Sequence, residues 1–448
     1  MAGPGIRYFH LSRVLQHYTD LTLAIIPQND QAVAALQAQL PGVSVMAYTR
    51  GEWDSIKQAA QASEVIIVPS GLIADFPNQL ANLDTAVVID GYNPLLAESL
   101  AMSAASAAQQ QPDTRHKAHL AAIYPQYLLG DFYLCASERQ RYWWLGQLEV
   151  AGRINPATYQ ADPSLRNLVD VSPYGLPEEP PQKRKPVIRD VWPGIEADDI
   201  LLLWGGGLWM WLDPLTAIQA VAQLHDEHPH IKLVFPGTRH PNADMAEFAP
   251  THFADMYAYA QQTGLLDTAV FFGDWVPYAD WPDVLLECDI ALSLHYETLE
   301  TSLAFRSRML EYIWAGLPII TNRGDATSDL VEKYDLGITV QYQNADEAAQ
   351  AILQIMASPA EERQANFAAA REQLSWQRAA RPLIRFCQNP HRAADRQTPL
   401  ANNLPYYDAE TAVRRITELE QLTQAYENGK FMRFMRTMNQ IGHRFRHF

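Results

Sequence analysis

The sequence is poor in cysteine, and its cysteines show no pattern typical of a structural centre. The 448 residues include only Cys135, Cys288 and Cys387, which lie far apart and form no CxxC pair. This usage argues against a structural zinc site and favours a reducing compartment. The N-terminus lacks the basic and then apolar pattern of a secretory signal, and the longest apolar run, around 200–212, is too short and too glycine-rich to span a bilayer. We therefore expect a cytoplasmic protein.

An excess of positive charge is also missing, and so are the signatures of several enzyme classes. The formal net charge is −17, which argues against binding nucleic acid over the whole surface. The sequence has no GxSxG, HExxH or GxxxxGK(S/T) motif, and its opening GPG lacks the spacing of a dinucleotide-binding loop. No Asp-x-Asp pair is present that would hold a divalent metal at a sugar diphosphate. We expect no nucleic acid partner, no metal and no cofactor.

The sequence does contain a regular alternation of short apolar runs and helical patterns. This alternation predicts βαβ units and parallel sheets in an α/β fold. The predicted strands are 21–27, 64–69, 86–90, 132–137 and 168–175 in a first set, and 200–206, 231–237, 269–274, 290–295, 317–322 and 337–341 in a second set.

The segment 176–199, rich in proline and charge, separates these two sets of strands. Two Rossmann-like domains facing each other across a cleft are therefore expected. We place an N-terminal domain at 1–180, a linker at 181–199, a C-terminal domain at 200–390 and a helical tail at 391–448.

The beginning of the chain departs from the Rossmann pattern. A Rossmann half starts with a strand, whereas here Gly3 to Gly5 lead directly into a helical pattern, IRYFHLSRVLQHY. The first strand normally lies in the middle of the sheet, so its loss would leave an unpaired edge. We therefore expect that Met1 is an internal methionine and that the native chain starts upstream of it.

The stretch LLLWGGGLWMWLDP, residues 201–214, predicts a strand, a glycine-rich turn and a helix, an order common at phosphate sites. Glycine lets backbone N–H groups approach an anion, yet this stretch holds no Lys or Arg. The positive end of a helix near Asp213 is equivalent to about half a charge, which is too little alone for a diphosphate. Either the cations come from elsewhere, or Gly205, Gly206 and Gly207 only make a tight turn.

Polar residues are densest in the segment 289–325. A strand is predicted to end at His295, and a loop with Glu297 and Glu300 leads to a helix that stops at Gly316. Candidate site residues on this helix are Arg306, Arg308 and Glu311.

Here the sequence resembles the GT-B glycosyltransferases of family four, the group 1 transferases. LEYIWAGLPII, residues 310–320, matches a helix-to-strand segment of that family, and 270–295 matches the run that precedes its acidic loop. The resemblance is specific over about 200–345 and looser over 1–200. It implies that Glu311 holds the ribose of a nucleotide-sugar donor, a role that fits a carboxylate beside two hydroxyls.

The sequence departs from the family in two places. Leu303 stands where the family has an acidic residue, so the contact to the donor sugar would fall to Glu300 or Glu297. The glycine turn lacks the family's Arg and Lys, so Arg306 or Arg308 would supply the charge for the diphosphate; Arg306 is slightly preferred.

Other candidate contacts carry alternatives. Trp209 would stack on sugar or base, or else pack in the core. His295 would contact the donor or be structural. In the N-terminal half, Gly3 and Gly5 resemble a family loop that leaves room for substrates. Arg7 would meet a phosphate there or lie exposed on a helix, and Asp90, at the end of a strand, would act in catalysis or cap a turn.

The resemblance implies a metal-independent hexosyltransferase that moves a sugar, with retention, from a nucleotide-diphosphate donor to a polysaccharide or glycolipid acceptor. The nucleotide sugar is then a substrate. Two alternatives remain: a non-catalytic GT-B-like binding or scaffold protein, and a nucleotide-sugar epimerase. The last twenty residues, 429–448, are basic and amphipathic, so they would lie on an anionic membrane surface or pack on protein. Membrane association on the inner face is therefore an expectation as well.

Overall fold

The computed structural model describes residues 3–27, 29, 31–105, 112–238, 250–359 and 361–396. All the described residues belong to one compact unit, Met1–Thr398. The predicted membrane-binding segment 429–448 lies outside the described residues. Within the described ranges, no helix is both long and apolar enough to cross a membrane.

The second set of strands forms one continuous parallel sheet. Its order is β12-β11-β10-β7-β8-β9. The strands are β7 (Ile200–Trp204), β8 (Ile231–Phe235), β9 (Val270–Phe272), β10 (Ile290–Ser293), β11 (Ile319–Asn322) and β12 (Gly337–Val340). The sequence of β7, ILLLW, is apolar at every position because a parallel strand in the middle of a sheet is covered on both faces.

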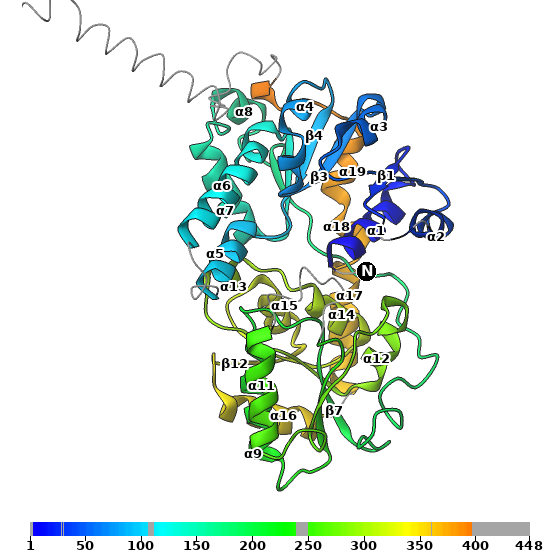
Figure 1. Ribbon diagram of the computed structural model, residues 1–448, viewed down its shortest axis with the longest axis vertical. Helices are drawn as coiled ribbons and strands as arrows, with labels where there is room; N and C mark the ends of the chain where they lie inside the picture. Colours follow the sequence, from blue (N-terminus) through cyan, green and yellow to red (C-terminus); the bar gives the residue numbers. More distant parts are fainter. Residues whose placement is uncertain are drawn as a thin grey trace, which may run out of the picture. The chain divides into compact units, whose positions relative to one another are not determined.

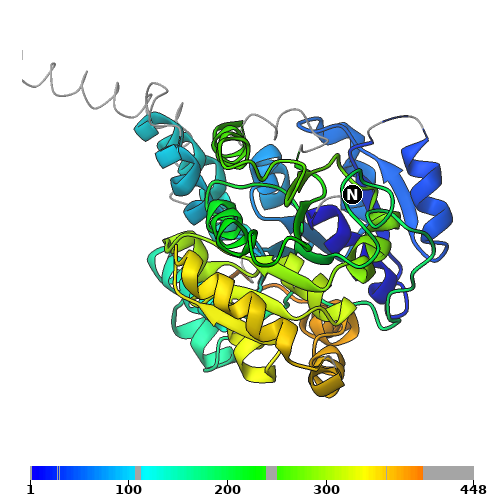
Figure 2. The same ribbon diagram turned by 90° about the horizontal axis from the view of Figure 1, so that it is seen from below.

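Helices cover both faces of this sheet (Figures 1 and 2). One layer consists of α9 (Pro214–Leu224), α11 (Pro250–Gln262) and α16 (Ala345–Ala357), and the other of α12 (Trp281–Glu287), α14 (Ser307–Ala315), α15 (Ala326–Tyr334) and α17 (Glu361–Gln373). Successive residues of β7 point to opposite layers: Leu201 and Leu203 pack with the second, and Leu202 and Trp204 with the first. The layer with α14 also contributes the candidate site.

The strands of the N-terminal half form two separate ladders. β1 (Thr22–Ile25) pairs only with β2 (Ser44–Ala47), while β3 (Val65–Pro69), β4 (Ala86–Asp90), β5 (Phe132–Cys135) and β6 (Val169–Val171) form a second parallel sheet. Every residue of β4 and β5 is buried, whereas β1 and β3 are apolar but largely half-exposed. The first element of the described chain is helix α1 (Gly3–Leu15), so no strand precedes it there, as the sequence indicates.

The remaining helices complete the two halves. They are α2 (Ala32–Gln39), α3 (Lys57–Ala62), α4 (Pro77–Ala81), α5 (Leu95–Ala105), α6 (Pro112–Leu129), α7 (Glu138–Val150), α8 (Pro156–Ala161) and α13 (Leu299–Leu303), with single-turn 3-10 helices η1 (Trp53–Ser55), η2 (Leu72–Asp75), η3 (Tyr278–Asp280) and η4 (Ala394–Arg396). Each predicted strand is found, usually a few residues shorter, and β2 has no counterpart among the predicted strands.

After the second sheet the chain returns to the first (Figure 1). Helices α18 (Trp376–Ala379) and α19 (Arg381–Gln388) lie against N-terminal strands: the ring of Phe386 stacks on Phe132 at 4.9 Å, and Ser172 Oγ donates to the carbonyl of Ala379 at 2.8 Å. These helices fall inside the range 200–390 assigned to the C-terminal domain, and the domain boundaries themselves stay a prediction.

Candidate functional site

The glycine turn follows β7 at the C-terminal edge of the sheet. Gly205 donates its N–H to the hydroxyl of Tyr312 at 2.8 Å, and a Cβ at this position would lie 2.7 Å from the same oxygen. Gly206 has φ = +83°, a conformation that L side chains rarely adopt. The N–H groups of Gly206 and Gly207 donate to no group in the described chain. The turn therefore offers two unused donors.

Arg308, in the first turn of α14, supplies positive charge beside this turn. Its Nη2 donates to the carbonyl of Gly207 at 3.1 Å, while Nη1 is buried without a hydrogen-bond partner. Among the described residues no carboxylate lies within ion-pair distance of this guanidinium. Burial lowers the pKa of Arg308 from its ordinary value. A partly buried cation that forms no ion pair with a described carboxylate thus lies next to two N–H groups that have no acceptor in the described chain.

Glu311 lies three residues further along α14, on the same face as Arg308 because residues three apart are neighbours on a helix. Its Oε2 accepts a hydrogen bond from Trp281 Nε1 at 2.8 Å. Burial raises the pKa of Glu311 to about 7, although the hydrogen bond from Trp281 and the charge of Arg308 act in the opposite direction. A carboxylate and a cation therefore lie side by side, the first beside Trp281 and the second beside the glycines.

Glu311 also lines a cavity of about 380 Å³. The other walls come from α1, from the segment 174–184, from η3 and α12, and from the indoles of Trp314 and Trp376. The row formed by the glycine turn, Arg308 and Glu311 thus ends in a cavity with aromatic walls. Such a row fits a ligand with an anionic group, then hydroxyls, then a planar ring.

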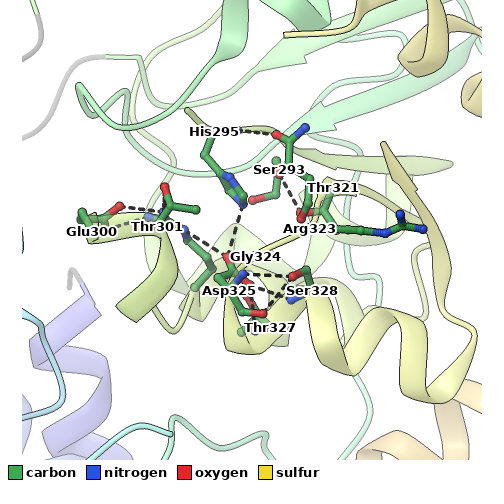
Figure 3. Close-up of polar contacts among 12 residues, drawn as sticks. Ser293, His295, Glu300, Thr301, Thr321, Arg323, Gly324, Asp325, Thr327 and Ser328 are labelled. Carbon is green, nitrogen blue, oxygen red and sulfur yellow. Dashed lines mark hydrogen bonds and ion pairs between the residues drawn. The ribbon is translucent and has the colours of Figure 1, made fainter. Parts of the chain in front are cut away.

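Arg306, two residues before Arg308, has different surroundings. Its guanidinium makes a bidentate pair with Glu300, with Nη1–Oε1 and Nη2–Oε2 distances of 2.9 and 2.8 Å. Its Nε lies 3.5 Å from Asp325 Oδ2. His295 Nε2 lies 3.3 Å from the same oxygen (Figure 3). All four side chains are buried. The structure therefore brings Arg306, Glu300 and His295 together, but in an internal ion-pair network.

Asp325 has a lowered pKa within this network. Burial alone would raise its pKa, but the hydrogen bond and charge of His295, the charge of Arg306 and the N–H of Ser328 lower it to about 2. Its Oδ1 accepts the N–H groups of Thr327 and Ser328 at 2.8 and 2.6 Å, which caps helix α15. Burial lowers the pKa of His295.

Asp90 and Arg7 form a second buried ion pair, in the N-terminal half. Arg7 Nε and Nη2 donate to the two oxygens of Asp90 at 2.8 and 2.9 Å, and Tyr8 donates to Asp90 Oδ2 at 2.9 Å. Arg7 also donates to the carbonyls of Ser172 and Pro173, and it is 1% exposed. Arg7 is therefore neither exposed on the helix nor free for a phosphate in this conformation.

Gly3 and Gly5 lie within helix α1, where the sequence suggested a loop. Trp209 stacks on Trp211 with ring centroids 5.4 Å apart, and its Nε1 would lie 3.5 Å from a Cβ at Gly207. The N-terminus of α9 does not offer a free anion site, since the carboxylate of Asp213 already accepts Thr216 N–H at 3.2 Å.

Two site residues escape the sequence reasoning: Trp281 and Tyr312. Tyr312 adjoins Glu311 in the matched segment, so its place beside Gly205 has a weak signal there. Trp281 lies thirty residues from Glu311, and no pattern in the sequence indicates their hydrogen bond. In the part of the chain that the structure describes, no group of His, Cys, Asp and Glu is arranged to hold a metal ion.

The fold and this site define a class. Two parallel α/β Rossmann-like halves, with a final return of the chain to the first half, form the GT-B fold of glycosyltransferases. Within that class, residues 206–373 match the family model described as glycosyl transferases group 1. The predicted resemblance to group 1 glycosyltransferases is thereby confirmed, and the match runs from Gly206 in the glycine turn to the end of α17.

Solved GT-B structures agree in fold. HepE from Anabaena, in complex with UDP and glucose, has a TM-score of 0.61 at 14% identity, with 87% of this chain and 97% of that chain covered. Sucrose-phosphate synthase from Thermosynechococcus elongatus has a TM-score of 0.59 at 15% identity, with coverages of 86% and 92%. WaaG, a glycosyltransferase involved in lipopolysaccharide biosynthesis, has a TM-score of 0.52 at 14% identity, with coverages of 87% and 97%. A search of curated protein sequences finds no significant match.

Proposed function

We propose that this protein is a metal-independent glycosyltransferase that moves a sugar from a nucleoside-diphosphate donor to a saccharide or glycolipid acceptor. One observation carries the proposal: the guanidinium of Arg308, without a carboxylate partner among the described residues, lies beside the free N–H groups of Gly206 and Gly207. Glu311, one turn further along α14, is then available for the hydroxyls of the ribose.

The charges of the site fit a diphosphate. Helix α14 begins at Ser307, and its N-cap residue Arg306 makes no side-chain cap, so the positive end of the helix lies next to Arg308. Arg308 adds a full charge, and the two glycine N–H groups add hydrogen bonds. We assign the diphosphate to Arg308 instead of Arg306, because Glu300 already neutralises Arg306. Charge that develops on the leaving phosphate during transfer would be stabilised by the same groups.

Several features of the proposal come from the family resemblance. These are retention at the transferred carbon and the acceptor site against the N-terminal half. The cytoplasmic location, with 429–448 at an anionic membrane, comes instead from sequence composition and from the basic amphipathic pattern of that segment. UDP is the first nucleotide to test, because HepE is described in complex with UDP and with UDP-glucose.

The test is isothermal titration of UDP, GDP, ADP and dTDP into the wild-type protein and into Arg308→Met. We expect one of these nucleotides to bind the wild type, and Arg308→Met to weaken it about 10- to 100-fold, since hydrogen bonds to charged groups contribute about 1.5–3 kcal/mol. The control is Arg323→Met, an exposed arginine that pairs with Glu332 at 2.7 Å, and it should leave the affinity unchanged. A wild-type protein that binds none of the four would refute the donor site.

A non-catalytic binding protein is the second candidate, and one observation favours it. Leu303 occupies the family's acidic position, and the carboxylate of Glu300 is taken by Arg306. A protein that binds the nucleotide sugar, yet neither transfers nor hydrolyses the sugar over a range of acceptors, would support this candidate.

A further inference from the structure

The ribose contact of the proposed donor site depends on the geometry of one carboxylate. Glu311 Oε2 accepts the indole N–H of Trp281, and Oε1 accepts no hydrogen bond within the described chain. Arg308, the nearest cation on the same helix, donates to Gly207 instead of to Glu311. The indole N–H is therefore the single hydrogen bond that the described residues give to this carboxylate.

Packing holds Trp281 in this position. The indole lies between the glycine turn and Glu311, because its Cζ2 would be 3.2 Å from a Cβ at Gly205. Trp281 begins helix α12, and Pro282 follows it in the first turn, so the backbone that carries the ring is restricted. The absence of a side chain at Gly205 thus leaves room for the ring that reaches Glu311.

We propose that Trp281 is a positioning residue for donor recognition: its indole N–H fixes one oxygen of the Glu311 carboxylate and aims the other oxygen at the ribose hydroxyls. This inference rests on the proposed function. A carboxylate accepts hydrogen bonds from both hydroxyls of a diol, whereas a protonated carboxyl has less acceptor capacity. Trp281 therefore contributes to the selection of a ribonucleotide over a deoxyribonucleotide without needing to contact the ribose itself.

The ionisation of Glu311 decides the pH range of binding. Burial raises its pKa to about 7, so the free protein takes up a proton there as the pH falls below that value. Ribose binding to the carboxylate should then weaken by up to about tenfold for each pH unit below 7. The titratable and charged groups that interact with Glu311 are Arg308, Tyr312, Tyr174 and Tyr278. Those that line the same cavity are His10, Arg13, Glu179 and Arg184.

Trp314 offers a matched control. It lies on the same helix as Glu311 and lines the same cavity, but its indole N–H donates to the carbonyl of Glu179 at 2.7 Å. Trp281→Phe and Trp314→Phe each remove one indole N–H and keep an aromatic ring. Only the first removes a hydrogen bond to Glu311.

The first measurement is carboxyl ¹³C NMR of the free protein between about pH 5 and pH 9, with the Glu311 resonance assigned through Glu311→Gln. In Trp281→Phe the titration midpoint of Glu311 should rise by about one pH unit, because a hydrogen bond to the charged form is lost. In Trp314→Phe it should not move. Equal midpoints in the wild type and Trp281→Phe, or equal shifts in both variants, would overturn the inference.

The second measurement compares UDP, GDP and ADP with their 2′-deoxy analogues by titration calorimetry. The wild type and Trp314→Phe should bind the ribonucleotide form of the donor nucleotide at least about tenfold more tightly, and Trp281→Phe should lose most of this preference. Nucleotide binding with the same preference in all three proteins refutes the role of Trp281 alone. No binding to the wild type refutes the donor site itself, whatever the NMR titration shows.

Discussion

Arg306 and Arg308 are two residues apart, yet the structure gives them opposite surroundings. Arg306 is 8% exposed and is held by Glu300, with Asp325 close by. Arg308 is partly buried and has a backbone carbonyl as its hydrogen-bond partner. The comparison shows that burial alone does not indicate what a guanidinium does. The carboxylates around it decide whether its charge is already compensated or is still available to an anionic ligand.

The two arginines should therefore respond differently to removal. A buried ion pair that loses one partner leaves an uncompensated charge in the interior, which costs far more than the pair contributed. A cation that forms no ion pair is desolvated with less compensation, so its removal breaks no ion pair.

The largest effect is expected for Arg306→Ala. The carboxylates of Glu300 and Asp325 would remain buried without their cation, so the free energy of unfolding should fall by about 3–5 kcal/mol. Arg308→Ala should change it by less than about 1 kcal/mol, since no described carboxylate forms an ion pair with Arg308. Urea unfolding followed by circular dichroism measures both. If both variants lost the same amount of unfolding free energy, the distinction between Arg306 in its ion-pair network and the unpaired Arg308 would be wrong.

A smaller effect, about 2 kcal/mol, should appear in acid through Asp325. Its pKa is lowered from 3.8 to about 2, so the folded state favours the ionised form, and this contribution is lost as the pH falls from about 4 to about 2. In Asp325→Asn, the unfolding free energy should no longer fall by this amount across that pH range. Asp329→Asn, one turn along α15, is the control, and its unfolding free energy should still fall as in the wild type. Parallel pH profiles for wild type and Asp325→Asn would contradict the assignment.

The next effect concerns Glu98 of α5, which lies in the N-terminal half. Burial and the negative charge of Glu300 raise its pKa to about 7, with Arg306 acting against them. A carboxyl with a raised pKa binds its proton more tightly in the folded state, so stability falls as the pH rises from about 4.5 to about 7. Glu98→Gln should therefore be more stable than the wild type by about 1 kcal/mol at pH 8, a value reduced for its partial exposure.

At pH 4 the same two proteins should differ little, because Glu98 is protonated in both states. Thermal unfolding at the two pH values measures the difference. A Glu98→Gln protein that is equally stabilised at both values would show that its effect is not ionisation.

The smallest effect is expected where an arginine pairs at the surface. Arg139 of α7 contacts Asp329 of α15 at 2.7 Å, with side chains that are 41% and 55% exposed. Such a pair contributes at most about 1 kcal/mol because water and salt screen it. Arg139→Ala should lower the unfolding free energy by less than that, and the loss should vanish in 0.5 M salt. A loss comparable to that of Arg306→Ala would mean that the number of neighbouring carboxylates does not predict how much each arginine contributes to stability.

Most of the fold could be predicted, because it depends on local patterns. Runs such as ILLLW at β7 and AVVID at β4 are long enough and apolar enough to be read directly. β2, with the sequence SVMA, is too short and too mixed to be distinguished from a loop. Gly316, which ends α14 in the left-handed conformation, was readable from the segment that carries the family resemblance.

The site was harder to predict, because it depends on which way side chains point. Arg306 is the N-cap of α14 and has an extended backbone, whereas Arg308 lies within the helix, so the direction of each side chain depends on the residue at which the helix begins. The contact between Trp281 and Glu311 joins two helices and has no local signal. Sequence reasoning could therefore locate the helix, but not decide which of its arginines is free.

The three consecutive glycines are alike in the sequence but not in what they tolerate. At Gly205 a methyl group would collide with the hydroxyl of Tyr312 at 2.7 Å, and at Gly206 any side chain would oppose a φ of +83°. At Gly207 the nearest atom would be Trp209 Nε1 at 3.5 Å, an ordinary van der Waals contact. A saturation library over these codons should therefore return glycine at the first two and a mixture of small residues at the third. Under selection, the first two positions of this motif should therefore be conserved as glycine, and the third should vary.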